Sequence, residues 1–141
     1  MKIYISQIYV KPGIKFYFSH FFQKLMSEEL TRLAKPSELF MKKYKEDTNI
    51  VFNLSAKQNL DEVEVIGPTV FKKTNDIEYS IFLPHDGSQT KSVIDHTDAL
   101  RSLFKSIILV LDELNIDSAN IENQIPMLME RIISDDSMFR F

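Results

Sequence analysis

Seven apolar residues between positions 100 and 114 recur at the spacing of an α-helix, and this stripe constrains the fold more than any other feature of the sequence. Polar and charged residues fill most of the positions between them. Thr97 or Asp95 can cap the start, so the spacing predicts a helix from 97 to 114. Such a helix must bury its apolar side against a sheet or other helices. The stripe consists of Leu100, Leu103, Phe104, Ile107, Ile108, Leu111 and Leu114.

Ahead of this helix, the apolar residues alternate with a period of two in three consecutive runs. The runs lie at residues 50–54, 63–66 and 77–83, and alternation of this kind is typical of strands with one buried face. The polar residues 73–76 form a hairpin turn between the last two runs, and Gly67-Pro68 marks a bend or bulge. Three strands in succession predict an antiparallel β-meander.

The remaining segments add one strand and three helices. A β-branched and aromatic run predicts a strand at residues 2–10, and helical spacing predicts a helix at 19–34. Pro36 can occupy the first turn of a second, shorter helix. Ser118 can cap a last helix, in which Pro126 implies a kink or a fresh start.

Length and composition favour a single globular domain. The chain has 141 residues, of which 44% are hydrophobic and 26% are charged, and such a chain can bury a core without disulfides or metals. The expected fold is therefore a single α+β domain, residues 1–141, with the antiparallel β-meander packed against a layer of helices.

The composition also excludes several kinds of site. Cysteine is absent, which excludes disulfides, thiol catalysis and cysteine-ligated metals, and the three glycines form no phosphate loop or dinucleotide fingerprint. The longest apolar run, IILVL at 107–111, is much shorter than a membrane span, and the first residues lack the pattern of a signal peptide. We expect a cytoplasmic protein without cofactor, metal or membrane partner.

The three histidines offer the only candidate catalytic groups. His85 and His96 each stand beside an aspartate at the two ends of one loop, which could ligate a metal or exchange a proton. Neither a metal-ligand spacing nor a partnered nucleophile accompanies them. Turn and cap roles for the neighbouring aspartates account for the pattern, and His20 is expected at the rim of the first helix. The chain is therefore not expected to be an enzyme.

A basic segment, FMKKYKED at 40–47, interleaves lysines with aromatic residues. Lys42, Lys43 and Lys45 beside Phe40 and Tyr44 could meet a nucleic-acid backbone. The adjacent carboxylates and the net charge of −3 instead favour the solvated face of a short helix. Direct nucleic-acid binding is not expected.

The charge is distributed unevenly along the chain. Residues 1–84 hold 12 Lys and Arg against 10 Asp and Glu, for a net +2, whereas residues 85–141 hold 5 against 10, for a net −5. The carboxylates thus collect in the C-terminal part.

Two segments around the predicted hairpin resemble a known family. VIGPTVFKK at 65–73 and IEYSIFLP at 77–84 precede the long predicted helix, whose end reads LDELNID. This succession resembles one group of bacterial immunity proteins from polymorphic toxin and contact-dependent growth inhibition systems, in which the Gly-Pro, a strand-borne aromatic and the Leu-Pro recur. The resemblance implies a cytoplasmic protein that binds the C-terminal domain of one cognate toxin, commonly a nuclease, and blocks it. It transfers no individual functional residue.

If the toxin is a nuclease, its cleft must attract phosphates, and an inhibitor gains association rate and specificity by presenting carboxylates to it. Each carboxylate could instead cap a helix or keep the surface solvated. Two alternatives stay open beside the immunity function: an α+β interaction or small-ligand-binding module, and an enzyme that uses the 85–98 loop. The toxin-binding candidates are Asp112, Glu113, Asp117, Glu122, Asp135 and Asp136.

Overall fold

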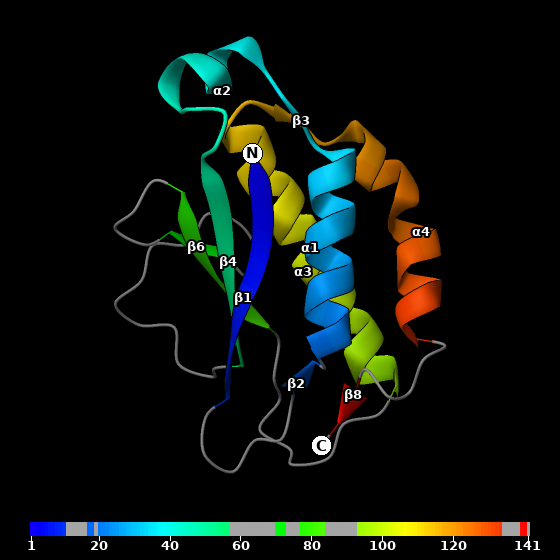
Figure 1. Cartoon of the computed structure of the whole chain (residues 1–141). Coiled ribbons are helices and arrows are strands. Elements are labelled where there is room, and N and C mark those ends of the chain that lie inside the picture. Colours follow the sequence, from blue (N-terminus) through cyan, green and yellow to red (C-terminus); the bar gives the residue numbers. More distant parts are fainter. Residues whose placement is uncertain are drawn as a thin grey trace.

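The computed structural model describes seven segments of the chain, and the account below concerns these residues. They are residues 1–10, 17–18, 20–56, 70–72, 77–83, 93–133 and 139–140. Both helices and strands are present, as expected for an α+β protein. Figure 1 shows the arrangement.

A mixed four-stranded sheet forms one layer of the structure, in the order β1-β4-β6-β5. The first three strands run parallel to one another, and only β5 runs antiparallel, against β6. The strands are β1 (Lys2–Val10), β4 (Asn49–Ala56), β5 (Val70–Lys72) and β6 (Glu78–Leu83).

The predicted antiparallel meander is therefore wrong for most of the sheet. The β5–β6 pair is antiparallel, as the hairpin prediction required. However, β6 pairs on its other side in parallel with β4, and β4 pairs in parallel with the N-terminal strand β1. Alternating apolar residues identify a strand with one buried face but carry no information on the direction of its neighbour. The predicted strand at 63–66, Gly67-Pro68 and the predicted turn at 73–76 lie outside the described residues.

Strand β1 contains a register shift that its sequence anticipates. The strand pairs Ile3 with Ile50 and Ile5 with Phe52, and the register then shifts between Ile5 and Gln7. The apolar alternation of the sequence changes phase over the same residues. One extra residue in a strand is the definition of a β-bulge, and it realigns the pattern with the partner strand.

Four helices accompany the sheet, and each was predicted from helical spacing. The observed limits differ from the predicted ones. Helix α3 starts before the predicted caps, so Asp95 and Thr97 lie inside the helix. No Pro or Gly near these residues interrupts the helix. Helix α4 continues through Pro126, which is exposed. The helices are α1 (His20–Leu33), α2 (Glu38–Lys43), α3 (Val93–Glu113) and α4 (Ala119–Ile133).

Two short strand pairs connect distant parts of the chain. In one, β2 (Tyr17–Phe18) pairs antiparallel with β8 (Phe139–Arg140). In the other, β3 (Lys35–Pro36) pairs antiparallel with β7 (Ile116–Asp117). Pro36 therefore belongs to a strand, and Ser37 caps α2 by accepting a hydrogen bond from the Phe40 amide at 3.1 Å.

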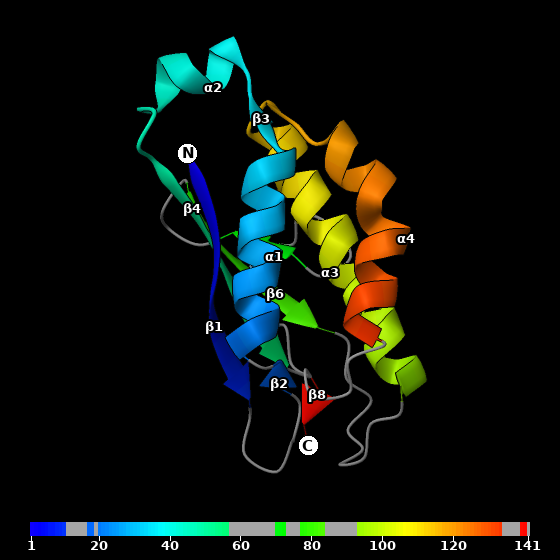
Figure 2. The same ribbon diagram turned by 45° about the vertical axis from the view of Figure 1, so that its right-hand side comes forward.

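Helices α1, α3 and α4 form a second layer on one side of the sheet, as the two views in Figures 1 and 2 show. Helix α1 packs against β1, α3 packs against β6, and α4 contacts both helices. The buried side chains form one hydrophobic cluster between the layers. Its largest fully buried members include Phe22, Phe40, Phe52, Tyr79 and Phe104.

Within the described part of the chain, no helix combines the length and the apolar character needed to cross a membrane.

Helix α3 gives a direct test of this core. Phe104 is completely buried on α3, whereas Leu109 on the same helix is 40% exposed. We expect Phe104→Ala to lower the free energy of unfolding by about 3–5 kcal/mol through loss of apolar burial and creation of a cavity. The control Leu109→Ala should cost less than about 1 kcal/mol. Equilibrium unfolding in urea measures both, and equal losses would contradict the packing of α3 described above.

Candidate functional site

Four of the predicted toxin-binding residues gather where α3 ends and α4 begins. Asp112 and Glu113 lie in the last turn of α3, Asp117 lies in β7, and Glu122 lies in the first turn of α4. All four are exposed. We call these four residues the acidic junction.

A left-handed residue sets the path of the chain through this junction. Asn115 has a φ of 60°, and its amide donates to the Asp112 carbonyl at 3.1 Å while the Leu114 amide donates to the Val110 carbonyl at 3.0 Å. A residue of this conformation commonly ends a helix, and Asn adopts it more readily than most residues. Ile116 follows and is buried, which anchors β7 beside β3.

Two of the four carboxylates are tethered by local hydrogen bonds. The buried Ser118 hydroxyl donates to Asp112 Oδ1 at 2.9 Å, and the Ala119 amide donates to Asp117 Oδ1 at 3.1 Å. Asp117 thus satisfies an amide at the start of α4, which is the cap role considered above. Within the described residues, the side chains of Glu113 and Glu122 have no hydrogen bond or ion pair.

The helix dipoles act on the four carboxylates in opposite directions. Asp117 and Glu122 stand at the amino end of α4, where the partial positive charge favours anions. Asp112 and Glu113 stand at the carboxyl end of α3, whose last turn holds no basic residue, and there the dipole disfavours them. Helix stability therefore explains Asp117 and Glu122 but not Glu113, which has neither a favourable dipole nor a partner in the part of the chain the structure describes.

The other candidates cannot be placed in a site. Asp135 and Asp136 lie outside the described residues, as do residues 84–92 with His85. His96 and Asp95 fall in α3, and His20 is the first residue of α1. Among the described residues, no three His, Asp or Glu side chains converge closely enough to hold a metal ion.

The basic segment 40–47 presents lysines but not aromatic faces. Lys42, Lys43 and Lys45 are exposed, whereas Phe40 is buried and Tyr44 packs against it with ring centroids 4.8 Å apart. Lys43 Nζ lies 5.3 Å from the centre of the Tyr44 ring. Because both rings are engaged in packing, this segment lacks the stacking platform that single-stranded nucleic acid requires.

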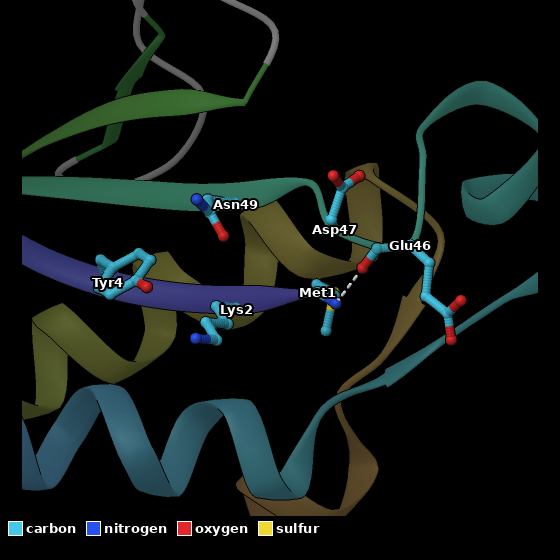
Figure 3. Close-up of a pocket in the computed structure, with 6 residues that line it drawn as sticks. All are labelled: Met1, Lys2, Tyr4, Glu46, Asp47 and Asn49. Carbon is cyan, nitrogen blue, oxygen red and sulfur yellow. Dashed lines mark hydrogen bonds between the residues drawn. The ribbon is translucent and has the colours of Figure 1, made fainter.

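The structure also contains a hollow that no sequence pattern indicated. It has a volume of about 570 Å³ and lies at the amino ends of β1 and β4, next to the turn that precedes β4 (Figure 3). The Met1 ammonium group donates to the Glu46 carbonyl at one side of it. The sequence did not indicate this hollow because its residues come from two segments about 45 positions apart, whose proximity depends on the fold. They are Met1, Lys2, Tyr4, Glu46, Asp47 and Asn49.

The position and lining of this hollow do not favour catalysis. Ligands of open α/β sheets bind outside the carboxyl ends of parallel strands, and this hollow lies at the opposite ends. Its lining holds no histidine and mixes Lys2 with the carboxylates of Glu46 and Asp47.

Comparison of the chain with protein-family models, with curated proteins and with solved structures gives no significant match.

The left-handed turn at the acidic junction can be tested by two substitutions at Asn115. Gly adopts a positive φ without steric cost, so Asn115→Gly should leave the free energy of unfolding within about 0.5 kcal/mol of the original or raise it slightly. A β-branched residue is disfavoured there, so Asn115→Val should cost about 1–3 kcal/mol. Urea unfolding compares the two variants. Equal stability of the Gly and Val variants would show that the positive φ does not constrain this turn.

Proposed function

We propose that this chain is an immunity protein that binds the C-terminal domain of one cognate toxin and covers its active site. Two observations support the proposal. The residues 65–73 and 77–84, with the long helix after them, resemble immunity proteins of polymorphic toxin and contact-dependent growth inhibition systems. The acidic junction supplies a surface of the charge that a nuclease inhibitor needs.

The observation that carries the proposal is the position of Glu113. Its carboxylate is exposed at the helix end where the dipole disfavours it, and it lies beside the exposed Asp112, Asp117 and Glu122. Placing negative charge at this end costs stability unless the charge serves another purpose. Attraction of a basic partner is such a purpose, because complementary charge raises the association rate and disfavours wrong partners.

In this proposal, the toxin domain is a nuclease with a cleft rich in Lys and Arg, and the immunity protein blocks that cleft without cofactor, metal or catalysis. The protein acts in the cytoplasm of the cell that makes the toxin, as a single domain. Asp135 and Asp136 stay candidates for toxin contact from the sequence. Inhibition of this kind requires only a complementary surface.

The direct experiment pairs the chain with its toxin. The gene that precedes its own should encode the C-terminal end of a large toxin, and co-expression with that toxin domain should restore growth of the host cells. A second, unrelated toxin domain serves as the specificity control. A well-expressed protein that neither protects cells nor binds the domain in solution would reject the proposal.

The acidic junction can be tested separately with a charge-matched control. The variant Glu113→Lys/Glu122→Lys changes two side chains without partners in the described part, and the dipole effects at the two helix ends have opposite signs, so folding should be preserved. The control Glu28→Lys/Glu130→Lys makes the same change in net charge at exposed positions on α1 and α4.

We expect the junction variant to associate with the toxin domain about three- to tenfold more slowly at low salt, with a smaller difference at high salt. The control variant should change the rate much less, because neither of its two residues belongs to the acidic junction. Stopped-flow measurements over a range of salt concentrations test this. The same rate and salt dependence for both variants would place the contact elsewhere.

A further inference from the structure

Helix α2 presents apolar side chains to solvent at one end of the molecule. Leu39 is 61% exposed, the highest value among the large hydrophobic residues of the described segments, and Met41 is 36% exposed. Phe40, between them, is buried and anchors the helix to the core. In both views α2 stands out beyond the ends of α1, α3 and α4 (Figures 1 and 2). Two apolar side chains on a projecting element are well placed to enter a recess of a partner.

The chain around α2 is positively charged. Residues 35–45 contain four lysines and one glutamate, for a net charge of +3, and all five side chains are exposed. Glu46 and Asp47 follow, but they line the hollow at the amino ends of β1 and β4 together with Lys2. Counting these three residues as well leaves a net charge of +2. The four lysines are Lys35, Lys42, Lys43 and Lys45.

The acidic junction lies at the same end of the molecule and has the opposite charge. Residues 106–130 contain five carboxylates, four of them in the acidic junction, and no Lys or Arg. The β3–β7 pair joins the two surfaces, because Lys35 pairs with Asp117 and Pro36 with Ile116. Leu39 follows Pro36 by three residues, which span at most about 11 Å. The acidic junction is therefore a neighbour of α2, and it is set back from the projecting helix (Figures 1 and 2).

We propose that α2 of one copy of this chain docks on the acidic junction of a second copy, in a dimer with two-fold symmetry. A two-fold axis in the plane of the contact places each surface opposite its counterpart, so both contacts form together. The lysines around α2 then face carboxylates, and Leu39 and Met41 are removed from water. The second copy is the occupant because a projecting basic helix fits a recessed acidic surface, and this chain carries both side by side.

This dimer does not depend on the proposed immunity function. Its charges are exposed in the monomer, so the contact is weak and sensitive to salt. The apparent dissociation constant of the dimer should rise about tenfold between roughly 0.02 M and 0.5 M salt. Because the dimer covers the acidic junction, it and a toxin complex formed through that junction exclude each other.

Charge reversal on each surface gives a specific test by sedimentation at low salt. The variant Lys42→Glu/Lys45→Glu opposes like charges in both contacts of its own dimer, and Glu113→Lys/Glu122→Lys removes the net charge of the acidic junction. Each variant alone should dimerise at least about tenfold more weakly than the original protein. An equimolar mixture retains one contact with the original charges on both sides. It should associate about three- to tenfold more tightly than either variant does alone.

Two controls make the same changes of net charge at exposed positions outside both surfaces. They are Lys24→Glu/Lys105→Glu on α1 and α3, and Glu28→Lys/Glu130→Lys on α1 and α4. Both should dimerise as the original protein does, and mixing them should change nothing.

The apolar part of the contact is tested separately. Leu39→Ser should weaken the dimer about threefold or more at every salt concentration, because burial of this side chain in the contact is lost. Leu109→Ser on α3, where Leu109 is 40% exposed, is the matched control and should leave the dimer unchanged. Both positions are exposed, so both variants should fold.

Three results would overturn the proposal. The first is a protein that stays monomeric at low salt up to the limit of its solubility. The second is a mixture of the two charge variants that associates no more tightly than either variant alone. The third is a dimer whose dissociation constant is the same for Leu39→Ser as for the original protein.

Discussion

The parallel pairing of β1 with β4 is the constraint on which the rest of the structure depends. Parallel neighbours cannot be joined by a tight turn, so the chain must cross over between their opposite ends. Helix α1 makes that crossing and so comes to lie beside β1, with Phe22, Met26 and Leu30 fully buried. Strand β6 then joins β4 in parallel, and α3 packs against β6 in the same layer. The acidic junction stands at the end of that layer.

Local spacing in the sequence was sufficient to predict the elements but not their neighbours. The alternation of Ile50, Phe52 and Leu54 identified a strand, and all three side chains are buried, but the pairing direction depends on a crossover that alternation does not encode. The apolar stripe predicted for α3 nearly matches the buried face of that helix. Val110 is fully buried and Ile108 only partly, because the helix is packed on two sides, by the sheet and by α4.

The same distinction applies to the candidate site. Proximity along the chain was enough to group Asp112, Glu113, Asp117 and Glu122. It could not show that Asp112 binds Ser118, or that Asn115 turns the chain between them, since both depend on how α3 and α4 meet. The hollow beside β1 and the hydrogen bonds from the Ile3 and Ile5 amides to Thr31 and Ser27 of α1 join residues far apart in sequence. No local pattern in the sequence identifies such contacts.

The two short strand pairs have a consequence for synthesis of the protein. Residues 17–18 pair with 139–140, and residues 35–36 pair with 116–117, so both pairs join the first part of the chain to the last. A ribosome releases the partners of each pair at widely separated times. The β1, α1 and β4 segments emerge early, but the helices that complete their core emerge late. The nascent N-terminal half therefore exposes an apolar surface during most of translation, which makes it a natural substrate for chaperones that act on unfinished chains.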